Sequence, residues 1–120
     1  MRIANPIARK GEDVAADYLK NHGYKLIERN FRKGYGEIDI VAVKGKTLVF
    51  VEVKTRTTDL FGGARESIAR YKLHKLIQTV QFYRLLHPKL PEAMRIDAIF
   101  IDVNSKGKFN IEHVENISGF

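Results

Sequence analysis

The chain has 120 residues, 44% of them hydrophobic and 29% charged, which suits one globular domain over residues 1–120 and excludes two separate cores. It contains no cysteine, which excludes a disulfide framework and a thiolate metal site. The formal net charge of +7 favours an anionic partner such as nucleic acid. No segment has the length and apolar character of a signal peptide or a membrane span, so we expect a cytoplasmic protein that does not bind membranes.

The N-terminal part of the sequence predicts a helix followed by a strand. Asn5-Pro6 suits a helix start, because asparagine caps a helix and proline fits its first position. The helix is expected to end near Asn21, before Gly23. Glu12 lies at the border of its apolar face, and residues 24–32 have the composition of a strand.

Residues 37–43 and 47–56 predict a β-hairpin. A two-residue turn at Gly45-Lys46 has glycine in the first central position, as a type II′ turn requires. In that register one face of the strand pair is entirely apolar, and a shift by one residue would mix apolar and charged side chains. The residues of this face are Ile38, Ile40, Ala42, Val49, Val51 and Val53.

The same register gathers charged residues at the far end of the hairpin. It places Asp39 opposite Glu52, and Glu37 opposite Lys54. Two facing carboxylates are destabilising unless a cation joins them, and Mg²⁺ favours such oxygen ligands. Lys54 projects from the face of Glu52, where its ammonium suits an attacking water or a phosphate. The alternative is a solvated ion pair between Glu52 and Lys54.

The second half of the chain predicts a long helix over residues 64–86 and strands over residues 95–103 and 109–114. The strand that follows the helix suits an inner position reached by a crossover connection. The expected fold class is α/β, a mixed sheet flanked by helices in the order α-β-β-β-α-β-β. The four histidines have no metal-ligand spacing and are interpreted as surface or helix-end residues. Three basic residues of the long helix lie off its apolar stripe and are either solvated or phosphate contacts: Arg65, Lys72 and Lys75.

An acidic helix residue, an aspartate on one strand and Glu-x-Lys on the next resemble the restriction-endonuclease-like superfamily of metal-dependent nucleases. Glu12, Asp39, Glu52 and Lys54 match this pattern in the order of the archaeal Holliday-junction resolvases. The chain resembles the bacterial YraN family more closely, although Ile38 stands where the superfamily often has proline. The hallmarks of that family are Gly11-Glu12, Gly36-Glu37-Ile38-Asp39, Phe50-Val51-Glu52-Val53-Lys54-Thr55-Arg56, Phe61-Gly62 and Lys72.

The resemblance implies a restriction-endonuclease-like fold that hydrolyses phosphodiester bonds with Mg²⁺ or Mn²⁺. Asp39, Glu52 and the backbone carbonyl of Val53 would hold the metal, with Glu12 as a further ligand or a neighbour that orients the ligands. Lys54 would position the hydrolytic water. Glu37 would be either an auxiliary ligand or the ion-pair partner of Lys54, and we favour the ion pair. The residues implied in contacts with the nucleic-acid backbone are Lys33, Arg56, Arg65, Lys72 and Lys75.

The expected function is therefore that of a DNA endonuclease in repair or recombination. Selectivity for junctions or flaps and a homodimeric state rest on analogy with the junction resolvases. Two alternatives stay open: a nucleic-acid-binding module of the same fold that does not cut, and a protein-interaction scaffold. Metal discriminates between them, because only the nuclease needs Asp39 and Glu52 to bind a divalent ion.

Overall fold

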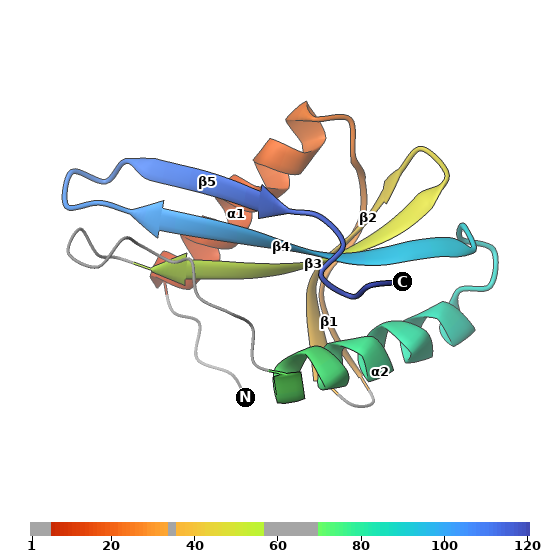
Figure 1. Cartoon of the computed structure of the whole chain (residues 1–120). Coiled ribbons are helices and arrows are strands. Elements are labelled where there is room, and N and C mark those ends of the chain that lie inside the picture. The colour runs from red at the N-terminus through yellow and green to blue at the C-terminus, as the bar shows by residue number, and fades with distance from the viewer. Residues whose placement is uncertain (1–5, 34–35, 57–69) are drawn as a thin grey trace.

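A computed structural model describes residues 6–33, 36–56 and 70–120, with two helices and five strands in this part of the chain (Figure 1). They follow in the predicted order, and the predicted class of a mixed sheet flanked by helices is confirmed. The start of the predicted long helix, residues 64–69, lies outside the described residues. The elements are α1 (Pro6–Asn21), β1 (Lys25–Lys33), β2 (Gly36–Lys44), β3 (Thr47–Arg56), α2 (Arg70–Leu86), β4 (Ala93–Val103) and β5 (Phe109–Val114).

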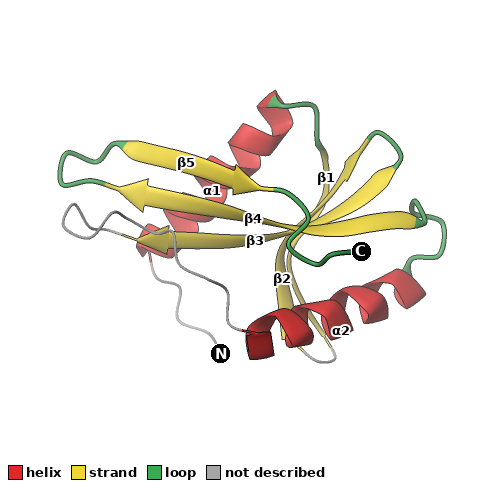
Figure 2. Cartoon of the chain, viewed as in Figure 1, coloured by secondary structure: helices red, strands yellow, loops and turns green. Residues whose placement is uncertain are grey.

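The five strands form one sheet in the order β1-β2-β3-β4-β5. All neighbouring pairs are antiparallel except β3 and β4, which are parallel and are connected through α2. Such a parallel pair requires a long crossover, and the sequence predicts this position for β4. Figure 2 shows the two helices on opposite sides of the sheet. No helix among the described residues is long and apolar enough to cross a membrane.

The predicted hairpin register is confirmed from the turn as far as Ile40 and Val51. Lys44 pairs with Thr47, and the ladder continues to the pair Ile40 and Val51. Gly45 has a φ of 59°, and Lys46 does not share this positive φ, as a type II′ turn requires. The turn and the alternation of apolar residues therefore specify one pairing.

Apolar clusters lie on both faces of the sheet, a large one under each helix and a small one around Ala98 and Phe100. The core under α1 contains four of the six residues predicted for the apolar face of the hairpin, and a fifth, Val53, packs against it. The sixth, Ile38, packs instead with Phe31 and Val80 in the core under α2. The prediction for Ile38 was wrong because β2 leaves the ladder with β3 before it reaches this residue and there pairs with β1 alone.

A buried polar network holds the C-terminal segment against the sheet. Asp97 is fully buried and accepts hydrogen bonds from Arg95 Nε at 2.9 Å and from the Asn116 backbone N–H at 2.9 Å. His113 Nε2 lies 2.8 Å from the second oxygen of Asp97, and its Nδ1 lies 3.2 Å from the hydroxyl of Tyr18 on α1. The interpretation of all four histidines as surface or helix-end residues was therefore wrong for His113.

Candidate active site

The central feature of the site is a pair of buried carboxylates on neighbouring strands. Asp39 on β2 is 7% exposed, and Glu52 on β3 is 8% exposed. The backbone ladder between these strands ends one pair earlier, at Ile40 and Val51. Beyond it, the Val53 N–H donates a hydrogen bond to Asp39 Oδ2 at 2.8 Å. Beyond the end of the ladder, Asp39 Oδ2 thus serves as the acceptor for the Val53 backbone N–H. This hydrogen bond fixes the position of the carboxyl group beside Glu52.

Glu52 affects the protonation of Asp39. Burial, the charge of Glu52 and a side-chain hydrogen bond with Glu52 raise the pKa of Asp39 to about 8, against a lowering effect of the Val53 N–H. Asp39 is therefore largely protonated at neutral pH in the metal-free protein. A carboxylate pair that is repulsive when both members are ionised is a suitable donor set for a divalent cation, because the cation takes the place of the shared proton.

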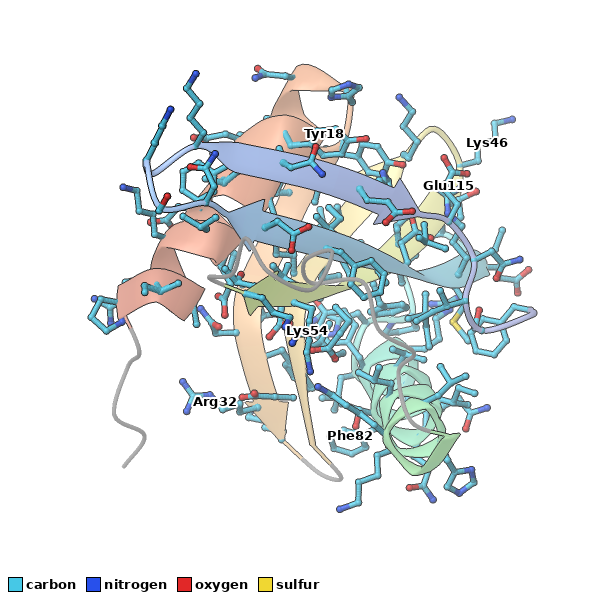
Figure 3. The ribbon with its side chains drawn as sticks, turned by 60° about the vertical axis from the view of Figure 1, so that its left-hand side comes forward. Tyr18, Arg32, Lys46, Lys54, Phe82 and Glu115 are labelled. Carbon is cyan, nitrogen blue, oxygen red and sulfur yellow. The ribbon has the colours of Figure 1, made fainter. Side chains whose placement is uncertain are left out.

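Two lysines belong to this site. Lys54 lies two residues after Glu52 on β3 and is half-buried, and Figure 3 shows it near the middle of the molecule, where β3 ends. Lys72 on α2 forms an ion pair with Glu52, with 3.4 Å between Nζ and Oε1. The sequence predicts Lys72 either as a solvated residue or as a phosphate contact. The crossover helix brings it directly to a predicted catalytic residue.

Glu12 reaches the edge of the sheet from α1. Its side chain is buried, and its Oε1 lies 3.8 Å from Arg29 Nη2, which also forms a 2.8 Å ion pair with Asp13 Oδ1. Within the described ranges no three acidic, histidine or cysteine side chains gather closely enough to hold a metal ion by themselves. Asp39 and Glu52 are in contact with each other. Such a pair suits Mg²⁺, which is usually bound by one or two carboxylates together with waters and phosphate oxygens.

The glycine before Glu12 allows α1 to approach β3 closely. A Cβ atom at Gly11 would lie 2.0 Å from Thr55 Oγ1 and 2.9 Å from the Cβ of the same threonine. We predict that Gly11→Ala lowers the free energy of unfolding by about 1–3 kcal/mol, because the helix must move away from the strand. Urea unfolding of Gly11→Ala, Thr55→Ala and the double variant measures this. Thr55→Ala should recover part of the loss, because it removes the hydroxyl and methyl groups but keeps the Cβ atom at 2.9 Å, and additive effects of the two substitutions would contradict the contact.

Three of the remaining predicted residues lie near the ends of β1, β2 and β3. Glu37 forms an ion pair with Arg32 across β1 and β2, with 3.5 Å between Oε2 and Nε. Lys33 is exposed at the end of β1, and Arg56 is half-buried at the end of β3. Arg65 lies outside the described residues.

A half-open cavity of about 260 Å³ adjoins the carboxylate pair. It lies between the start of β2, the middle of β3 and one face of α2, and Glu52 belongs to its wall. Sequence reasoning missed this cavity, although the spacing of residues 72, 75, 76 and 79 along one helix face is its signal. The lining residues are Gly36, Glu37, Glu52, Lys72, Lys75, Leu76 and Thr79.

Comparison with known proteins places the chain among proteins of similar length. The model of the family described as "Uncharacterised protein family UPF0102" matches residues 11–101. A UPF0102 protein of Persephonella marina is 44% identical over 108 residues, covering 90% of this chain and 89% of the relative. A UPF0102 protein of Mycolicibacterium vanbaalenii is 34% identical over 112 residues, covering 93% of each chain.

Two solved structures are more distantly similar. A repair endonuclease from Pyrococcus abyssi aligns with a TM-score of 0.40 and 18% identity over 89% of this chain. SfsA of Pyrococcus furiosus in complex with Ca²⁺ aligns with a TM-score of 0.42 and 16% identity over 89% of this chain. The aligned regions cover 42% and 61% of those two chains.

Proposed function

The chain belongs to the UPF0102 family, in keeping with its resemblance to YraN proteins, and we propose that it is a metal-dependent endonuclease that hydrolyses the phosphodiester bonds of DNA. The observation that carries the proposal is the buried contact between Asp39 and Glu52 on adjacent strands, with Lys54 two residues further along. A restriction-endonuclease-like assignment of the mixed sheet is part of this proposal. An acid pair that costs stability in the metal-free protein is expected where a cation binds.

The donor set fits Mg²⁺ or Mn²⁺. Asp39 and Glu52 supply hard carboxylate oxygens, and the backbone carbonyl of Val53 would supply a third. Glu12 would be a further ligand or would orient these ligands. When bound, the cation polarises a phosphate oxygen and lowers the pKa of a water molecule.

Lys54 and Lys72 are proposed to act on the water and the phosphate beside the carboxylate pair. The Lys54 ammonium would orient the attacking water and offset the negative charge that develops on the phosphate. Lys72 holds Glu52 by an ion pair in the metal-free protein. Once a cation neutralises the carboxylates, this ammonium would be available for a phosphate oxygen of the substrate.

The surrounding basic residues would supply affinity without sequence specificity. Contacts from lysine and arginine to phosphates position a nucleic acid and release its counterions, and the net charge of +7 supports such a role. A cytoplasmic location, a homodimer, and selectivity for junctions or flaps in repair or recombination are further parts of the proposal. The residues proposed for backbone contacts are Lys33, Arg56, Arg65, Lys72 and Lys75.

The proposal is tested by incubating labelled duplex, single-stranded, flap and four-way-junction DNA with the protein and Mn²⁺. We expect metal-dependent cleavage of at least one substrate, and a loss of about 10³-fold or more in Glu52→Gln because a metal ligand is removed. Lys54→Met should lose about 10²-fold, the typical effect of removing one charge-stabilising donor. Glu115→Gln, an exposed acid on the C-terminal segment, is the matched control.

Three results would count against the endonuclease. Cleavage that survives in Glu52→Gln would mean that the site is elsewhere. Binding of DNA without cleavage, unaffected by Glu52→Gln and steeply weakened by salt, would identify a binding module. Neither cleavage nor binding would favour the interaction scaffold.

A further inference from the structure

The α2 wall of the cavity beside Glu52 has a charged end and a neutral end, and Glu37 and Glu52 line the facing strands. Lys72 and Lys75 line one part of its wall, and the Lys72 ammonium is placed there by the ion pair with Glu52. Leu76 and Thr79 follow on the same helix face, three to four residues further along α2. The helix thus presents two cations and then an apolar and a hydroxyl-bearing side chain.

The neutral end is built from buried side chains. Leu76 is 5% exposed, and Thr79 is 1% exposed. The Thr79 hydroxyl donates a hydrogen bond to the Lys75 carbonyl of its own helix at 2.8 Å, so its proton is satisfied within the helix and the residue adds no unpaired donor to the cavity wall. This end therefore suits a flat group that needs van der Waals contact and little charge.

Gly36 leaves space at the wall of the cavity that faces α2. A Cβ atom at Gly36, the first residue of β2, would lie 3.2 Å from Thr79 Oγ1. Any side chain at this position would therefore narrow the neutral end. No positive φ is recorded at Gly36, so the need for glycine here is one of space and not of backbone conformation.

From this arrangement we propose that the cavity holds one unpaired nucleotide of the strand that is cut. Its base would lie against Leu76 and Thr79, and its phosphate would lie between Lys72 and Lys75, beside the carboxylate pair. At about 260 Å³ the cavity is at the small end of ligand sites, which limits it to a single nucleotide. This inference rests on the proposed endonuclease and narrows its substrate class.

The physical consequence is a preference for DNA with an unpaired nucleotide at the scissile phosphate. A base inside a duplex must be unstacked and unpaired before it can enter a pocket, at a cost of a few kcal/mol, whereas a base in a single strand or flap pays much less. Single strands, flaps and junction branch points should therefore be cut in preference to continuous duplex.

The test uses a single-stranded oligonucleotide carrying 2-aminopurine, titrated at 4 °C with Mn²⁺ present and read before cleavage products appear on a gel. We expect a change of fluorescence on binding to the wild-type protein. Gly36→Val should weaken binding by about 10-fold or more, and Gly36→Ala by less, since the added volume enters the base site. Lys75→Met should also weaken binding, whereas Lys46→Met, in the turn between β2 and β3 and far from Lys54 in Figure 3, should not. Thermal unfolding of each variant confirms that it is folded.

The outcomes separate this inference from the endonuclease. Equal affinity and equal fluorescence change in wild type and Gly36→Val would overturn the nucleotide site, even if the protein cuts DNA. Fluorescence that responds to Gly36→Val in a protein without cleavage would support the site and reject the endonuclease. Titration with free dAMP distinguishes the ligand source: binding as tight as that of the oligonucleotide would overturn the assignment to a strand in favour of a free mononucleotide.

Discussion

Asp39→Asn is expected to make the metal-free protein more stable while it removes the metal site. Asparagine keeps an oxygen to accept the Val53 N–H, which lies 2.8 Å from Asp39 Oδ2 in the wild type. It also replaces an acid whose pKa is raised to about 8, because the buried carboxyl is costly to ionise beside Glu52. We expect Tm to rise by roughly 10 °C at pH 8, which corresponds to a few kcal/mol.

The pH dependence of this difference has a definite sign. The pKa of Asp39 is higher in the folded protein, so the stability associated with its proton is fully present below about pH 3.8 and is lost as pH rises toward 8. Asparagine does not titrate. The gap in Tm between Asp39→Asn and wild type should therefore widen from pH 5 to pH 8 and then level off.

Differential scanning calorimetry in EDTA at pH 5, 6.5, 8 and 9 measures this gap. Addition of Mn²⁺ should stabilise the wild type by ligand linkage and leave Asp39→Asn unchanged. Asp17→Asn, which removes an exposed acid of α1, is the control. A gap that is constant with pH, or a variant less stable than the wild type, would show that Asp39 and Glu52 do not share a buried proton.

Asp97→Ala is expected to destabilise the protein by about 3 kcal/mol or more. Asp97 is fully buried and accepts hydrogen bonds from Arg95 and from the backbone N–H of Asn116, and His113 lies against its other oxygen. Removing it leaves a largely buried guanidinium without its main partner and frees the C-terminal segment. Tm should fall by about 10 °C at pH 7.

The control and the pH dependence separate this network from a general effect of removing an acid. Asp102 is on the same strand, and its buried Oδ1 has no hydrogen-bond partner among the described residues, so Asp102→Ala should cost little.

Burial acts to raise the pKa of Asp97, but the hydrogen bonds from His113, Arg95 and Asn116 outweigh it and lower this pKa. The stability that Asp97 contributes is therefore present above about pH 3.8 and is lost as pH falls further. The free energies of unfolding of the wild type and Asp97→Ala should therefore converge in acid. Equal urea midpoints for Asp97→Ala and Asp102→Ala at pH 7 would contradict the network.

The hairpin that carries the site is predictable from the sequence because its determinants are local. Alternation of apolar residues and the glycine of the Gly45-Lys46 turn specify the register, and this register brings Asp39 to Glu52. The parallel position of β4 is likewise predictable, since a helix between two apolar strands favours a crossover. Ile38 was misplaced because the alternation rule assumes a regular two-strand ladder, and here the ladder ends at Ile40.

The features that sequence reasoning missed depend on contacts between distant segments. In the sequence, Lys72 is one of several cations on a helix face. Only the packing of α2 across β2 brings its ammonium to Glu52. The network around Asp97 joins residues from 16 to 95 positions apart in sequence, and neither Asp97 nor His113 has a local pattern that marks it. The cavity arises from the way the start of β2 faces α2, so the spacing of residues 72, 75, 76 and 79 gives one wall of it and the sequence does not give the other.

The measurement that tests the central claim most directly is Mn²⁺-dependent cleavage of flap and single-stranded DNA by wild type and Asp39→Asn at pH 8, side by side. Because the variant is expected to be the more stable protein, its inactivity cannot result from unfolding. The endonuclease requires that the wild type cuts only with metal, and that the variant is at least about 10³-fold slower. Cleavage at similar rates by both proteins, or a wild type that binds these DNAs with Mn²⁺ and never cuts them, would contradict it.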